Sequence, residues 1–149
     1  MKSSEILVRE GRPEDASSVV ALIGQLGGEA DIPTGLSESY VREALRTEGY
    51  GLLVAEGESG IIGVLSYSVR PSLWHGEDSC LIEELVVDAA HRGQGVGTAL
   101  VQALLARGEA KTWSEISVSA MPDNKRAIAL YRSLGFTDEA VLLERHRQG

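Results

Sequence analysis

Apolar and polar positions recur along this chain with two different periods. Runs rich in β-branched and aromatic residues predict strands over residues 5–9, 50–55, 61–69, 79–87, 115–119 and 136–144. Apolar positions at helical spacing and helix-start residues predict helices that begin near Arg12, Ser37, Val96 and Asn124. No repeat or linker interrupts the pattern, so we expect one α/β (α+β) domain over residues 1–149. Its sheet should be mixed but mostly antiparallel, with about six or seven strands flanked by about four helices.

Glycines mark the connections between these predicted elements. Gly27 and Gly28 should end the first helix, and residues 29–35 read as a loop. Residues 56–60, Glu-Gly-Glu-Ser-Gly, predict the turn of a hairpin. We therefore expect a helix, loop and helix to precede the hairpin.

The stretch Arg92-Gly93-Gln94-Gly95-Val96-Gly97 joins the strand that ends at Val87 to the next helix. Glycines let a backbone turn sharply, and a helix start presents free N–H groups and the positive end of its dipole. This combination favours a bound phosphate. A tight turn without a ligand is the alternative for this loop alone.

The glycine spacing excludes two common nucleotide motifs. A dinucleotide fingerprint starting at Gly93 would need glycine in place of Thr98, and no P-loop sequence occurs in the chain. The spacing instead resembles Arg/Gln-x-x-Gly-x-Gly/Ala, the signature of the GNAT superfamily of acyl-CoA-dependent N-acyltransferases.

A second segment strengthens this resemblance. The stretch from Asn124 to Phe136 is similar to the GNAT pattern Asn-x-x-Ala-x-x-Leu-Tyr-x-x-x-Gly-Phe at every signature position. With Glu83 and Glu84 ahead of the glycine loop, the resemblance extends from about Gly51 to Phe136. The first fifty residues resemble the family only in pattern.

The resemblance implies acetyl-CoA as cosubstrate and a GNAT fold. The loop and helix start would hold the coenzyme A pyrophosphate, through Arg92, Gly93, Gln94, Gly95, Val96, Gly97 and Thr98. The strand ahead of the loop would part from its neighbour and pair its backbone with the pantetheine arm, through Leu85, Val86 and Val87. Asn124 would contact the same arm, although capping its own helix is the alternative.

The chemistry of acetyl transfer to an amine points to a base. An alkylammonium has a pKa of about 10.4, so a group that removes its proton at neutral pH adds directly to the rate. Glu83 and Glu84 are the candidates, and strand alternation should point them to opposite faces unless a bulge intervenes. By resemblance we favour Glu83; a structural carboxylate paired with an arginine is the alternative for either residue.

Two further side chains carry possible chemistry. By resemblance, Tyr131 would donate a proton to the departing thiolate; a core aromatic is the alternative, because Ala127, Ile128 and Leu134 share its helix face. Cys80, the single cysteine, is expected to be a packed residue and not an acyl carrier. His91 and His146 have no spacing that supports a metal site, and we expect none.

Composition and charge limit the kinds of molecule that we expect this protein to bind. The net charge of −8 and the scattered lysines and arginines argue against nucleic acid and fit a cationic acceptor such as a polyamine, a lysine side chain or an aminoglycoside. No segment resembles a membrane span, and Met1 to Arg12 lacks the apolar core of a signal peptide. These features predict a cytoplasmic protein. Dimers are common among similar proteins, so a homodimer fits as well.

Together these features predict an acetyl-CoA-dependent N-acetyltransferase that acts on a primary amine of a small molecule by direct attack in a ternary complex. Protein or peptide acetylation, at an N-terminus or a lysine, is the nearest alternative. A non-catalytic acyl-CoA-binding regulatory module is a third, disfavoured by the intact set of Glu83, Glu84 and Tyr131.

Overall fold

The computed structural model describes residues 5–27 and 35–147. The chain forms two compact units, residues 1–118 and residues 119–149, which we describe separately. The prediction of a single domain over residues 1–149 stays a prediction. Gly28 and most of the predicted loop 29–35 lie outside the described residues.

The first unit is built on a sheet of five described strands in the order β1-β2-β3-β4-β5. The strands are β1 (Leu7–Glu10), β2 (Tyr50–Gly57), β3 (Gly60–Ser72), β4 (Glu77–Val87) and β5 (Ile116–Val118). Neighbours pair antiparallel, except that β4 and β5 are parallel. The expectation of a mixed, mostly antiparallel sheet is confirmed.

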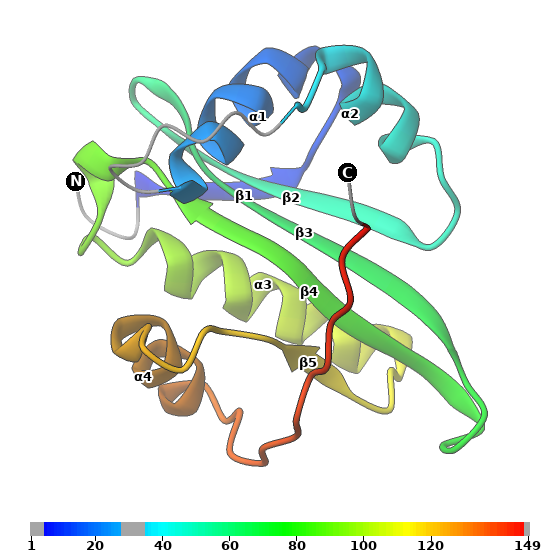
Figure 1. Cartoon of the computed structure of the whole chain (residues 1–149). Helices are drawn as coiled ribbons and strands as arrows, with labels where there is room; N and C mark the ends of the chain where they lie inside the picture. Colours follow the sequence, from blue (N-terminus) through cyan, green and yellow to red (C-terminus); the bar gives the residue numbers. More distant parts are fainter. Residues whose placement is uncertain (1–4, 28–34, 148–149) are drawn as a thin grey trace. The chain divides into compact units, whose positions relative to one another are not determined.

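Three α-helices of this unit cover the two faces of the sheet (Figure 1). α1 (Ala16–Ile23) and α2 (Glu38–Leu45) lie on one face, and α3 (Val96–Lys111) lies on the other. Short 3-10 helices flank them: η2 (Pro13–Asp15), η3 (Gly24–Gly27) and η4 (Ala89–His91). Ser37 caps α2 as predicted, because its hydroxyl accepts the N–H of Tyr40 at 3.1 Å.

Alternation along the strands supplies a core on each face. On the α1 and α2 face, buried apolar side chains of both helices and of β2, β3 and β4 form one cluster: Ala16, Val19, Leu22, Val41, Leu52, Val54, Val64 and Val86. On the other face, a Cβ at Gly63 would lie 2.8 Å from Val96 Cγ1, so glycine lets the start of α3 pack closely on β3. This contact sets the position of the loop that precedes α3.

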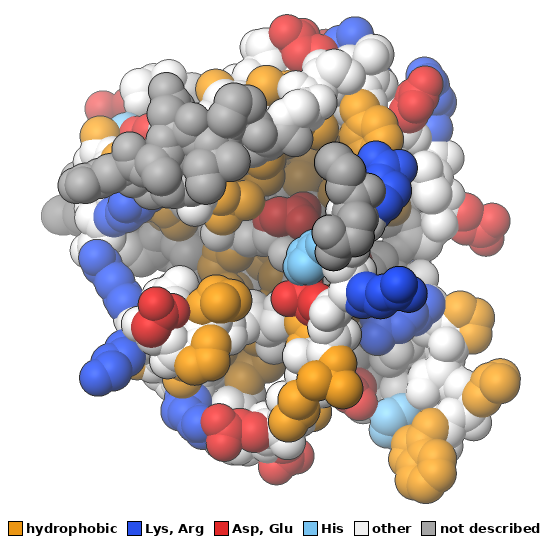
Figure 2. All heavy atoms as spheres, viewed as in Figure 1, with side chains coloured by type: hydrophobic (Ala, Val, Ile, Leu, Met, Phe, Trp, Pro, Cys, Tyr) orange, Lys and Arg blue, Asp and Glu red, His pale blue; other side chains and the backbone are white. Residues whose placement is uncertain are grey.

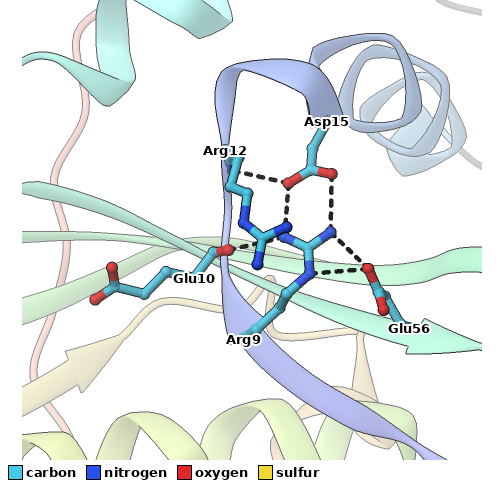
Figure 3. A network of polar contacts seen from close by, with 5 residues as sticks. All are labelled: Arg9, Glu10, Arg12, Asp15 and Glu56. Atoms are coloured by element: carbon cyan, nitrogen blue, oxygen red, sulfur yellow. Dashed lines mark hydrogen bonds and ion pairs between the residues drawn. The ribbon is translucent and has the colours of Figure 1, made fainter.

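A network of hydrogen bonds and ion pairs stabilises the segment that leads into α1 (Figure 3). The Arg9 guanidinium donates to both carboxylate oxygens of Asp15, at 2.8 and 3.0 Å, and to Glu56 Oε1 at 2.6 and 2.8 Å. The Arg12 N–H also donates to Asp15, at 2.7 Å. The hydrogen bonds from Arg9 hold the pKa of the buried Asp15 below its usual value, although burial opposes the shift. The network joins β1, β2 and the start of α1.

The second unit contains α4 (Lys125–Ser133) and an extended tail. The predicted strand over residues 136–144 is wrong: residues 136–147 have no regular secondary structure, and the described sheet has five strands instead of about six or seven. The β-rich composition of this segment indicates a preference only, and a strand exists only where a ladder partner satisfies its backbone. The side chains of Val141 and Leu143 are accordingly exposed.

Candidate functional site

A β-bulge in β4 decides how the two glutamates lie. Ser66 of β3 pairs with Glu84 and Tyr67 pairs with Ile82, so Glu83 is an extra residue without a direct partner. The extra residue removes the alternation expected between Glu83 and Glu84. Opposite faces were expected only without a bulge; the bulge is present, so this alternation does not apply to Glu83 and Glu84.

Two serines on one face of β3 hold the two carboxylates. The Ser66 hydroxyl donates to Glu84 Oε1 at 2.5 Å, and the Ser68 hydroxyl donates to Glu83 Oε2 at 2.5 Å. Ser66 and Ser68 are two residues apart in a strand, so they share a face. Both glutamates therefore reach the face that α1 and α2 cover.

Both glutamates line one pocket of about 500 Å³. Its other walls come from α2, from the turn after α2 and from the start of β2: Tyr40, Glu43, Ala44, Thr47 and Tyr50. Burial raises the pKa of the Tyr50 phenol, and the nearby charges of Glu84 and Glu83 add to this, while a hydrogen bond with Ser66 acts against it. Three glutamates and two tyrosines thus line the pocket.

The pairing of β4 with β5 is shorter than β4 itself. The parallel register covers Cys80 to Ile82 opposite Ile116 to Val118, whereas β4 continues to Val87. Leu85, Val86 and Val87 keep their antiparallel pairing with β3. On the other edge, the second half of β4 has no strand partner in the described part of the chain.

The glycine turn follows this half of β4 after Asp88 and η4 (Ala89–His91). Gly93 and Gly95 have φ of 77° and 84°, a left-handed backbone that favours glycine. Gly95 is the N-cap of α3, and no side chain caps this helix start. The first helical hydrogen bond runs from the Ala99 N–H to the Gly95 carbonyl at 3.0 Å. The amides of Val96, Gly97 and Thr98 therefore have no helical acceptor.

This helix start has the properties that a phosphate requires. Its first turn contains no acidic residue, and the positive end of the dipole of a 16-residue helix lies there. Arg92 is exposed beside the turn, and its Nε donates to the Val87 carbonyl at 3.3 Å. Among the described residues, Gln94 Oε1 is a buried side-chain oxygen without a hydrogen-bond partner. The residues present fit a pyrophosphate group.

The second unit carries the other signature residues. Asn124 is the N-cap of α4, and its Oδ1 accepts the Ala127 N–H at 3.2 Å, so its capping role is confirmed. Tyr131 packs edge-on against Phe136, with ring centres 5.7 Å apart. Burial raises the pKa of the Tyr131 phenol, which keeps it protonated at neutral pH. The catalytic role of Tyr131 stays a prediction.

Other candidate chemistry is not supported. Cys80 is fully buried, and burial raises the pKa of its thiol to about 12, so it is packed as predicted. In the described ranges, no group of three or more His, Cys, Asp or Glu side chains could hold a metal ion. No helix of the described chain has both the length and the apolar character needed to cross a membrane.

Several residues of the pocket were not indicated by the sequence pattern. Ser66 and Ser68 were detectable as polar positions two apart in an apolar strand, but nothing marked them as ligands of the glutamates. Tyr40, Glu43 and Tyr50 enter the pocket only because α2 packs over the sheet. No local signal in the sequence would have assigned them to this site.

Comparison with known proteins identifies the family of this chain. Residues 25–136, more than half of the chain, match the model of the Acetyltransferase (GNAT) family. A thialysine N-epsilon-acetyltransferase of Mus musculus is 30% identical over 88% of this chain and 84% of its own.

Solved structures show the same fold. A crystal structure of a transcriptional regulator from Bacillus halodurans C-125 is 27% identical with a TM-score of 0.83, over 95% of this chain and 99% of that one. The structure of an aminoglycoside acetyltransferase from an uncultured soil metagenomic sample is 25% identical with a TM-score of 0.81, over 96% and 99%. The resemblance found in the sequence is confirmed, and the chain belongs to the acetyltransferase (GNAT) family.

Proposed function

We propose that this protein transfers an acetyl group from acetyl-CoA to a primary amine of a cationic small molecule, by direct attack while both substrates are bound. The observation that carries the proposal is the bulge in β4, which brings Glu83 and Glu84 into one pocket, on the strand that leads through η4 to the glycine turn. A base and a phosphate site on consecutive parts of one strand-turn-helix segment suit this reaction.

The charge of the pocket supports a cationic acceptor. Glu43, Glu83 and Glu84 line it together, and the described residues of its lining include no Lys, Arg or His. None of the three glutamates takes part in an ion pair among the described residues. The rings of Tyr40 and Tyr50 add faces that attract ammonium groups. An acceptor with two ammonium groups could place each of them beside a carboxylate.

Figure 2 shows how charged side chains are distributed on one face of the molecule. On the face drawn there, Lys and Arg side chains are spread out and interspersed with Asp and Glu. The described residues drawn on this face form no continuous basic patch of the kind that nucleic-acid binding requires. The names of the relatives fit the same picture, since thialysine and aminoglycosides are small amines.

Each step of the reaction has a candidate group in this chain. Acetyl-CoA supplies an acetyl group activated as a thioester. Glu83 takes a proton from the acceptor ammonium, directly or through water, and the neutral nitrogen then forms the new N–C bond as the C–S bond breaks. Tyr131 gives its proton to the sulfur, and the second proton that the nitrogen loses on becoming an amide restores the phenol through solvent. Backbone groups of Leu85 to Val87 and the amides at the start of α3 hold the cosubstrate in place.

A thiol-release assay tests the proposal. Acetyl-CoA would be offered with matched pairs of acceptors, 1,4-diaminobutane against butylamine and lysine against norleucine, and with an aminoglycoside and a short peptide. We expect the dicationic small molecules to be acetylated fastest. Turnover of the peptide alone would replace the small-molecule proposal by peptide acetylation. Binding of coenzyme A with no turnover of any acceptor would indicate a regulatory module.

A further inference from the structure

The side chain of Gln25, in η3, forms two hydrogen bonds with the segment that leads into the glycine turn. Its Nε2 donates to Asp88 Oδ1 at 2.9 Å, and its Oε1 accepts the Ala89 N–H at 3.0 Å. Gln25 and Asp88 are 63 positions apart in the sequence. Both ends of one amide group are therefore used on two adjacent residues of a distant segment.

Asp88 links the residues that Gln25 contacts to η4 and to β3. Its second carboxylate oxygen lies 2.8 Å from His91 Nδ1, and its backbone carbonyl accepts the His91 N–H at 2.8 Å. Its own N–H donates to the Ile62 carbonyl of β3 at 2.8 Å. The hydrogen bonds from Gln25 and then His91 lower the pKa of Asp88, so its side chain is an anionic carboxylate at neutral pH.

The two ends of the glycine turn are thus held in different ways. At its far end, Val96 packs against the bare backbone of Gly63. At its near end, η4 runs from Ala89 to His91 directly into Arg92 and Gly93, and Gln25 holds the residues where η4 begins. Without Gln25, this near end would keep only local bonds and the bond to Ile62.

We propose that Gln25 is a positioning residue for the glycine turn. Through its hydrogen bonds to Asp88 and Ala89 it sets the path of this turn, and thereby the affinity of the protein for the pyrophosphate of acetyl-CoA. This rests on the proposed function of the loop. Gln25 itself touches neither the substrate nor the reacting atoms. Its effect belongs in the binding of the cosubstrate and not in the chemical step.

The primary test compares two acetyl donors. S-acetylpantetheine has the same reacting thioester as acetyl-CoA but lacks the pyrophosphate. Gln25→Leu removes both hydrogen bonds at similar volume, and we expect it to raise the Kd and KM for acetyl-CoA about tenfold, with kcat at saturation unchanged. The kcat/KM for S-acetylpantetheine should stay within about twofold of the wild-type value, because no phosphate contact is lost. Gln102→Leu, at an exposed glutamine of α3, is the matched control.

A swap of donor and acceptor tests the contact itself. Gln25→Glu alone places a second carboxylate against Asp88, and the affinity for coenzyme A should fall by about tenfold or more. Combining it with Asp88→Asn restores a donor opposite an acceptor, since the introduced amide can donate to the introduced carboxylate and still accept from His91. The double variant should recover most of the affinity, which a simple packing role would not predict.

The outcomes separate this inference from the proposed function. If the wild-type protein does not bind coenzyme A in calorimetry, or uses both donors equally well, the phosphate site itself is wrong. If the wild type prefers acetyl-CoA but Gln25→Leu leaves its Kd unchanged, or slows both donors equally, Gln25 does not position the loop. If Gln25→Leu does not fold, the swap pair decides, and failure of Asp88→Asn to restore affinity overturns the proposal.

Discussion

Ser66 holds Glu84 at two points: its hydroxyl donates to Glu84 Oε1 at 2.5 Å and accepts the Glu84 backbone N–H at 3.0 Å. A side chain thus accepts the N–H of Glu84 next to the bulge. Glu83, by contrast, is exposed, and its carboxylate accepts a hydrogen bond from the Ser68 hydroxyl. Glu84 is the anchored carboxylate of the pair, and Glu83 is the accessible one.

This difference leads to separate predictions for the two glutamates. Glu83→Gln keeps the shape and removes the base, so kcat at neutral pH should fall about 100-fold and recover partly at high pH, where the amine deprotonates unaided. Glu84→Gln should mainly raise the KM for the amine, because it removes one charge from the pocket. Steady-state kinetics over a pH series measures both. A large, pH-recoverable loss of kcat in Glu84→Gln alone would show that the assignments are reversed.

Gly95 tests the phosphate site at the start of α3. At φ of 84° only glycine is free of strain, although asparagine tolerates this backbone better than most residues. Gly95→Asp adds bulk and a negative charge where a pyrophosphate would bind, and the Kd for coenzyme A should rise at least about tenfold. Gly95→Asn controls for bulk and strain. Equal affinity of a folded Gly95→Asp variant and the wild type, by calorimetry, would remove the site from this loop.

Tyr131 can be tested without disturbing its packing. Tyr131→Phe keeps the ring that lies edge-on against Phe136 and removes only the hydroxyl. Stability and coenzyme A affinity should change little, while turnover falls about 100-fold if the phenol acts as general acid. The measurement is kcat under conditions where chemistry limits the rate, with Tm as the control for folding. Near-normal turnover would leave Tyr131 as a core aromatic.

Asp15 gives the fold a defined response to acid. Its pKa is lowered in the folded state, so the stabilisation is complete above about pH 4, the ordinary aspartate pKa, and is lost as pH falls through the folded value. Asp15→Asn should reduce the free energy of unfolding by about 3 kcal/mol at pH 7, because Arg9 loses a mostly buried partner. Urea denaturation from pH 3 to 7 should show this difference shrinking in acid. Asp138→Asn, at an exposed site, is the control; a constant difference across pH would contradict the assignment.

Local rules predicted most elements of the first unit. The glycine turn, the Ser37 cap, the hairpin between β2 and β3 and the helix after Gly95 depend on backbone preferences and hydrogen bonds within a few residues. Such features can be derived from sequence because their partners are neighbours in the chain. The same is true of the two family signatures, whose spacing is visible without coordinates.

Non-local pairing decided the rest. Whether residues 136–144 form a strand depends on a distant partner, and here they form none. The common orientation of Glu83 and Glu84 depends on one extra residue in a ladder with β3, which alternation along β4 cannot reveal. Gln25 and Asp88 meet only because η3 lies beside the residue that follows β4. The sequence alone therefore determined the family and its motifs, whereas register and packing between distant segments decided which side chains share the pocket.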